Sequence, residues 1–288
     1  MSINTKDFLE AAENGNTNRL TDLLCQGVDP NVTDDLEQTA LIYAGMNSHT
    51  NAVRLLLTNG ADPNAKSIYG STALMCARDN GYVDTVSILL TNGADPEVQD
   101  KNGQTALISA AQLGQTEPVH LLLINGADPK VQSHDGNTAL IVAAEQGHAD
   151  IVRLLLTKPV DPNEKNNSGD TAPNKAAYSN HTEIVGLLLT NRADPNVRND
   201  QNCTALMMAA QNGHAAAVGF LLANRADRDM RNNQGITALM LAAEKGHDAV
   251  VNRLLHSHAE NFSHYSDVPR ALVGDEVLDT MIREEDGV

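Results

Sequence analysis

Histidine is the side chain whose spacing in this sequence could support metal or proton-transfer chemistry. Five of the ten histidines are separated by multiples of 33 residues: His49, His148, His181, His214 and His247. Zinc ligands must meet on one ion at about 2 Å, whereas neighbours in this series are separated by at least one whole interval. We therefore expect a structural role for these histidines and no metal site.

A second histidine group lies near the C-terminal end of the chain. His256, His258 and His264 occur there close to Glu260 and Asp267, and zinc can use all of these side-chain types. A polar turn that closes the fold would use the same residues, and we favour that interpretation over a zinc site.

The three cysteines, Cys25, Cys76 and Cys203, show no paired spacing. Disulfides are therefore not expected, and a reducing compartment, the cytoplasm, is the default. Cys203 lies at a predicted turn tip, where a thiol could react, but no basic residue adjoins it to favour the thiolate. The sequence thus predicts no catalytic residue, no metal ligand and no cofactor.

The elements that position these residues repeat every 33 residues. A Thr-Ala pair, followed by Leu in all but one copy, recurs at Thr39, Thr72, Thr105, Thr138, Thr171, Thr204 and Thr237. An Asp-Pro pair recurs at Asp29, Asp62, Asp95, Asp128, Asp161 and Asp194. Each interval holds two short segments with helical apolar spacing, opened by a capping residue and mostly closed by Gly. Two helices this short cannot bury a core alone, so the units must stack on one another.

A turn, two helices and an Asp-Pro-Asn type of ending, repeated every 33 residues, resemble the ankyrin repeat. The resemblance extends over roughly residues 5–260. It implies an all-α repeat solenoid with β-hairpin-like loops and terminal capping helices. The expected organisation is a single solenoid over 1–288, with repeats at 5–33, 34–66, 67–99, 100–132, 133–165, 166–198, 199–231 and 232–262, then a C-terminal cap helix and acidic tail at 263–288.

Two neighbouring prolines break the pattern. Pro159 occupies the place of Gly60 and Gly126, where the helix end favours a positive φ that proline cannot adopt. Pro173 replaces the leucine that follows the next Thr-Ala pair, so a core side chain becomes smaller. We predict that this is the weakest joint of the array, and compensation by neighbouring residues is the alternative.

The charge of the chain restricts its partners. The net charge is −17, and residues 1–150 hold 19 acidic and 7 basic residues, a net charge of −12. Phosphate binding needs a basic field, so we expect no nucleic acid partner. An acidic surface favours a protein partner with a basic surface, although solubility alone would also explain the charge. With no N-terminal signal pattern and no long apolar run, we expect no membrane contact, and we expect a monomer.

In the ankyrin family, partners usually contact the hairpin tips and the exposed side of the first helices. The resemblance assigns partner binding to Asp35, Leu36, Tyr43, Met46, Asn47, Ile68, Tyr69, Asp79, Asn80, Gln112, Leu113, Glu145, Gln146 and Tyr178. Leu36, Ile68 and Tyr69 are apolar residues on adjacent tips, which predicts an anchor patch. For Tyr43, inward packing is the alternative.

A column of basic residues precedes the turns, at Lys66, Lys165, Arg198 and Arg231. It could grip an acidic partner, but we favour a solvated edge.

Together these features predict a non-enzymatic protein-interaction module or scaffold that binds a protein through its hairpin tips and concave helix face. Thr-Ala-Leu, in place of the family's usual Thr-Pro-Leu-His, resembles bacterial members of the family. The module could therefore be a bacterial effector acting on a host protein, delivered without an N-terminal signal peptide. The alternative function is a regulatory subunit that modulates an enzyme in trans.

Overall fold

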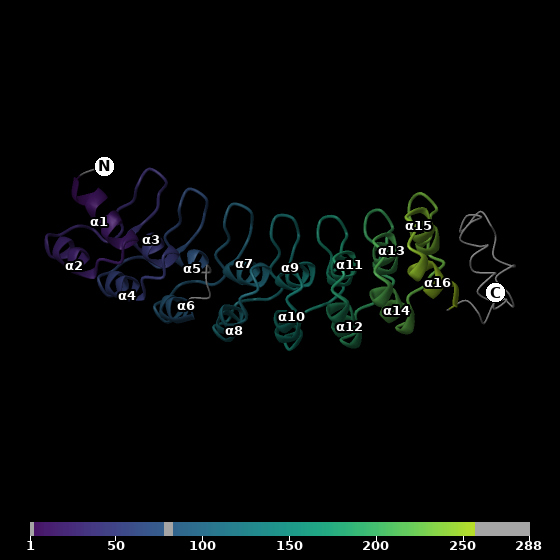
Figure 1. Cartoon of the computed structure of the whole chain (residues 1–288). Helices are drawn as coiled ribbons and strands as arrows, with labels where there is room; N and C mark the ends of the chain where they lie inside the picture. Colours follow the sequence, from purple (N-terminus) through teal and green to yellow (C-terminus); the bar gives the residue numbers. More distant parts are fainter. Residues whose placement is uncertain (1–2, 78–82, 257–288) are drawn as a thin grey trace. The chain divides into compact units, whose positions relative to one another are not determined.

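The computed structural model describes residues 3–77 and 83–256. Within them, the regular structure consists of sixteen short α-helices and one isolated antiparallel bridge between Thr33 and Thr39. The chain divides into two compact units, residues 1–139 and residues 140–288. Each unit is an array of helix pairs (Figure 1).

The described part of the first unit contains four helix pairs. They are α1 (Ile3–Glu13) with α2 (Thr17–Cys25), α3 (Ala40–Met46) with α4 (Thr50–Thr58), α5 (Ala73–Cys76) with α6 (Val83–Thr91), and α7 (Ala106–Gln112) with α8 (Thr116–Ile124). First helices contact first helices from α1 to α7, and second helices contact second helices from α2 to α8. The loops that join the pairs project on the side of the first helices (Figure 1).

The second unit repeats this arrangement. Its helices are α9 (Ala139–Gln146, whose first residue belongs to the first unit), α10 (Ala149–Leu156), α11 (Ala172–Tyr178), α12 (Thr182–Thr190), α13 (Ala205–Gln211), α14 (Ala215–Ala223), α15 (Ala238–Glu244) and α16 (Asp248–His256). α11 contacts α13, which contacts α15, and the second helices stack from α10 to α16.

Threonine starts most of the first helices because its hydroxyl accepts a hydrogen bond from an N–H that the helix leaves without a partner. The Oγ1 atoms of Thr39, Thr72, Thr105, Thr204 and Thr237 accept from the N–H three residues further on, at 3.2–3.4 Å. The 33-residue spacing of threonine therefore sets the helix starts.

Most of the second helices are followed, two residues after their last residue, by a residue with positive φ. Gly60 and Gly126 have φ of 86° and 93° there, and Arg192 and Arg225 adopt 72° and 68° at the equivalent position. Glycine takes this conformation without a steric penalty, whereas a side chain disfavours it. The two arginines therefore carry local strain at these helix ends.

Pro159 shortens the helix that precedes it. α10 ends at Leu156, one residue earlier than the equivalent helices α4, α8 and α12, because proline cannot adopt the positive φ of that position. Pro173 lies in the first turn of α11, where a missing N–H is tolerated. α11 therefore forms, and the weakness of this joint stays a prediction.

The core consists of small and branched apolar residues at equivalent positions of successive repeats. In α3, both Ala40 and Leu41 are buried. A Cβ added to Gly45 would lie 3.0 Å from the carbonyl oxygen of Ala73 on α5. First helices this close leave room only for small side chains between them.

The predicted all-α array of paired, stacked helices is confirmed. The continuous solenoid over 1–288 stays a prediction. The C-terminal cap helix and acidic tail predicted for 263–288 lie outside the described residues.

Candidate functional site

The 33-residue histidine series links successive repeats. In four of the five, Nε2 lies 2.9–3.0 Å from a carbonyl near the end of the preceding first helix: His49 with Glu13, His181 with Glu145, His214 with Tyr178 and His247 with Gln211. The ring of His181 also covers Gly147, where an added Cβ would approach it to 2.5 Å. These histidines therefore clamp the end of one repeat to the next.

Within the residues that the structure describes, no three His, Cys, Asp or Glu side chains come together as metal ligands do. Of the second histidine group, only His256 is described. Its Nδ1 lies 2.7 Å from the carbonyl of Asn252. The other members, His258, Glu260, His264 and Asp267, lie outside the described residues.

The Cys203 thiol is not activated, and two lysines of the basic column have partners within the protein. Burial raises the pKa of the Cys203 thiol, which disfavours the nucleophilic thiolate. Lys66 Nζ donates to the carbonyl of Gln99 at 3.3 Å, and Lys165 Nζ donates to that of Arg198 at 2.7 Å. Both lysine side chains therefore bond to the backbone of the next repeat, at the residue that precedes its hairpin turn.

The hairpin tips of the first unit form a connected edge. The N–H of Ile68 donates to the carbonyl of Leu36 at 2.9 Å, and the N–H of Lys101 donates to that of Tyr69 at 3.0 Å. Leu36 is 39% exposed and Tyr69 is 58% exposed, while Ile68 is half-buried. The structure therefore brings the three apolar tip residues together, and two of them face solvent.

The first-helix positions predicted to face a partner are mostly exposed. Met46, Asn47, Gln112 and Leu113 are exposed in the first unit, and Gln146 and Tyr178 are exposed in the second. Glu145 is half-buried, and Asp35, at its tip, is exposed. Asp79 and Asn80 lie outside the described residues. Partner binding by all of these residues stays a prediction.

Tyr43 has a structural partner. Its ring is half-buried, and its hydroxyl donates to Asp34 Oδ2 at 2.7 Å. Burial, together with this hydrogen bond, raises the pKa of Tyr43 to about 12. Asp34 Oδ1 accepts from the N–H groups of Leu36 and Gln38 at 2.9 and 2.8 Å. Tyr43 therefore braces the turn that carries Leu36.

Helix α11 contains a buried amide at a position that is apolar in the neighbouring repeats. Asn174 stands where Ile141 and Met207 stand in those repeats, and it is 1% exposed. Its Oδ1 accepts from both the N–H and the hydroxyl of Thr171. Its Nδ2 is buried with no hydrogen-bond partner, which is a destabilising arrangement.

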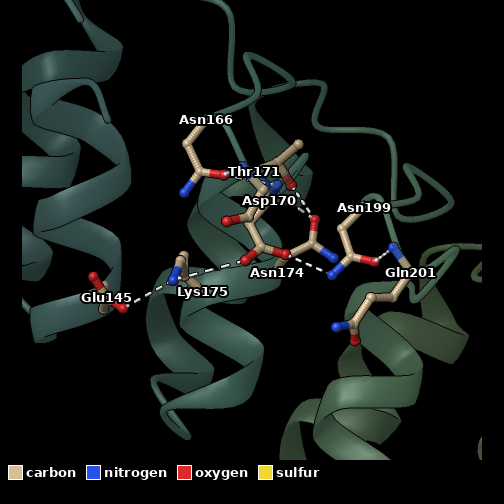
Figure 2. A network of polar contacts seen from close by, with 9 residues as sticks. Glu145, Asn166, Asp170, Thr171, Asn174, Lys175, Asn199 and Gln201 are labelled. Carbon is tan, nitrogen blue, oxygen red and sulfur yellow. Dashed lines mark hydrogen bonds and ion pairs between the residues drawn. The ribbon is translucent and has the colours of Figure 1, made fainter. Parts of the chain in front are cut away.

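Charged and amide groups surround this asparagine (Figure 2). Lys175 Nζ lies 3.1 Å from Glu145 Oε1 and 3.7 Å from Asp170 Oδ2. Asn199 Nδ2 donates to Asp170 Oδ1 at 2.8 Å, and Asn199 Oδ1 accepts from the N–H of Gln201 at 3.0 Å. We call Glu145, Asp170, Thr171, Asn174, Lys175 and Asn199 the α11 network. This network was not predicted from the sequence. The available signal was Asn174, a polar residue beside Pro173 at a position that is apolar in the neighbouring repeats.

A comparison with protein-family models matches ankyrin repeats (3 copies) to residues 8–100, 57–133, 80–166, 107–199 and 174–264. These matches together cover most of the chain. The chain belongs to the ankyrin-repeat family. Ankyrin repeats are typically non-catalytic binding modules, so membership suggests a protein-interaction scaffold with a protein partner. A search of curated proteins returns no match.

Two further surfaces of these ankyrin repeats were not expected. Ile124 on α8 is 58% exposed, and Phe220 on α14 is also exposed. Sequence reasoning assigned binding only to tips and first helices, so it passed over these second-helix residues. Among the described helices, none is long and apolar enough to cross a bilayer.

Proposed function

We propose that this ankyrin array is a non-enzymatic interaction module that binds a protein with a basic surface through the tips of repeats two to four. The observation that carries the proposal is the exposure of Leu36 and Tyr69 on two tips joined by a backbone hydrogen bond. A large aromatic side chain beside an aliphatic one is a common anchor in protein interfaces. We call Leu36, Ile68 and Tyr69 the tip patch.

Acidic residues surround the tip patch. Asp35 and Glu37 flank Leu36, and Asp100 opens the next turn after Tyr69. Carboxylates around an apolar centre attract a basic surface at long range, and the apolar centre then holds it. The net charge of −12 over residues 1–150 extends the same field.

Glu37 supports a role for this tip beyond folding. Its φ is 56°, whereas Gly70 and Gly103 occupy the equivalent position of the next two tips. A non-glycine residue at positive φ costs about 1–2 kcal/mol, and such strain is often found at binding sites. Glycine would relieve this strain, so the presence of a carboxylate here favours a use for its charge.

We place this interaction in the cytoplasm. The proposal extends to a bacterial effector that acts on a host protein, which rests on the Thr-Ala-Leu form of the repeats alone.

Affinity capture with matched variants tests the proposal. The wild-type chain is compared with the double variant Leu36→Ala, Tyr69→Ala, and captured proteins are identified by mass spectrometry. The control is Ile124→Ala, which removes an equally exposed apolar side chain from a second helix of the same unit. We expect a basic protein that the wild type and the control capture and the double variant does not.

Capture that survives loss of both tip side chains would refute the tip patch. A captured protein with no basic surface would refute the electrostatic part of the proposal. Circular dichroism of each variant checks that the fold is kept.

A further inference from the structure

The second unit has a depression between its hairpin tips and first helices, with a volume of about 480 Å³. Its lining includes Glu145, Asp170, Lys175, Tyr178, Asp200 and Gln201. Glu145, Asp170, Lys175 and Asn199 of the α11 network, whose contacts Figure 2 shows, belong to this lining, and we call them its acidic wall.

The charges that line the depression do not balance. Glu145, Asp170 and Asp200 supply three carboxylates, and Lys175 supplies one ammonium group. Lys175 already bridges Glu145 and Asp170. Two negative charges therefore remain uncompensated at neutral pH, and a cationic guest would balance them.

Two of the lining residues are available to such a guest. Asp200 is exposed and has no ion-pair partner in the part of the chain that the structure describes. Tyr178 is 57% exposed, so a face of its ring is open to a ligand. A cation beside a carboxylate and an aromatic ring gains from both groups.

The acidic wall is held in place before any ligand binds. Asp170 is 9% exposed, and its two oxygens are fixed by Asn199 and by Lys175. Gln201 is oriented through its N–H, which donates to Asn199 Oδ1. A ligand would therefore meet a site that needs little ordering, which favours binding.

The charged residues Asp170 and Lys175 occur at these positions in one repeat only. No other repeat has a carboxylate at the position of Asp170 or a basic residue at the position of Lys175. The same helix accepts a buried, unpartnered amide at Asn174. Sequences that depart from the local rules of their fold often do so at functional sites.

We propose that this depression binds an arginine side chain carried on an extended segment of a protein partner. Arginine fits better than lysine because its planar guanidinium can stack on an aromatic ring such as Tyr178 and its N–H fork can pair with a carboxylate of the lining. The inference rests on the proposed function only in taking a protein as the ligand, since every residue named here lies outside the first unit.

Nuclear magnetic resonance with three short peptides tests the site directly. The probes are acetylated Gly-Ser-Arg-Ser-Gly amide and the same peptide with lysine or with citrulline, a neutral isostere of arginine, at the centre. We expect the arginine peptide to shift the side-chain amide resonances of Asn199 and Gln201 saturably, with a Kd of about 1–10 mM. The lysine peptide should bind about 3-fold more weakly, and the citrulline peptide should cause no shift.

Variants separate this site from general attraction to an acidic protein. Tyr178→Ala should weaken the arginine peptide about 3-fold, and Asp200→Lys should abolish its binding. Asp150→Lys, an equal charge reversal at an exposed position outside the depression, should have little effect. Equal binding of lysine and arginine peptides, or equal losses in both charge reversals, would overturn the proposal.

The outcome is independent of the tip patch. Leu36→Ala, Tyr69→Ala should leave the peptide titration unchanged, because both residues lie in the first unit. If the titration shows no saturable shift up to about 20 mM peptide, the arginine site is wrong while the tip patch still stands or falls by affinity capture.

Discussion

Replacing Asn174 with methionine is expected to stabilise α11, although it removes part of the α11 network. Methionine stands at this position as Met75, Met207 and Met240. Burial of its side chain contributes about 1.5 kcal/mol, and removal of the unpartnered Nδ2 contributes about 1 kcal/mol. Loss of the acceptor for both the N–H and the hydroxyl of Thr171 offsets about 2 kcal/mol. The net expectation is a gain of about 0.5 kcal/mol.

Native-state hydrogen exchange measures this gain locally, which matters because repeat arrays need not unfold in one step. The amides of α11 should exchange about 2-fold more slowly in Asn174→Met than in the wild type. The matched control is the reverse change in the next repeat, Met207→Asn, at a residue 1% exposed. It should destabilise α13 by about 2–3 kcal/mol. Faster exchange of α11 in Asn174→Met would show that the polar network stabilises the helix and that this reasoning is wrong.

Four further predictions follow from individual contacts. Pro159→Gly with Pro173→Leu should stabilise repeats five and six by roughly 1–3 kcal/mol together. In the wild type, native-state hydrogen exchange should be fastest near residues 157–180, and uniform protection there would contradict a weak joint. Once a partner is known, Tyr69→Ala should weaken binding by about 2 kcal/mol, mainly through faster dissociation. Asp35→Asn or Asp100→Asn should instead slow association and reduce its salt dependence. If affinity depends neither on salt concentration nor on Tyr69, the binding surface lies elsewhere. Gly147→Ala should lower the melting temperature of the protein more than Gly60→Ala does. Both glycines have φ of 86°, but only a Cβ added at Gly147 meets a histidine ring. Equal losses of stability would mean that the ring moves aside freely. Because the pKa of Tyr43 is raised to about 12, its contribution to stability should be complete below pH 10 and disappear between about pH 10 and 12; Tyr43→Phe should lose this pH dependence in denaturant unfolding.

The sequence was sufficient for the helix pairs because their signals are local. A threonine cap at Thr105 and a positive φ at Gly126 act within a few residues, so a 33-residue period carries them to every repeat. Exposure of Tyr69 and Tyr178 also followed from position, since tips and helix ends recur in register.

The α11 network could not be found in this way. Whether Asn174 is a defect or part of a network depends on Asp170 and on Asn199, which donates to Asp170 from 29 residues further along the chain. Likewise, the partner of His214 is the carbonyl of Tyr178, 36 residues earlier. Every residue has a backbone carbonyl, so the sequence does not indicate which carbonyl serves as an acceptor. It shows that a histidine recurs but not which group it bonds to.

The Asp-Pro-Asn endings also form a seam between neighbouring repeats. Asn31 Oδ1 accepts from the N–H of Asp62 at 2.7 Å, and Asn31 Nδ2 donates to the carbonyl of Gly60 at 3.1 Å. The same two bonds recur one period later, from Asn64 to Asp95 and to Gly93. Because each repeat offers the same partners to the next, removal of one whole 33-residue block brings together ends that already match. A cut of any other length would misalign the seam at the joint. Duplication or loss of a complete 33-residue block therefore changes the length of the array and keeps the hydrogen bonds between repeats. Two such arrays could be joined at the same positions.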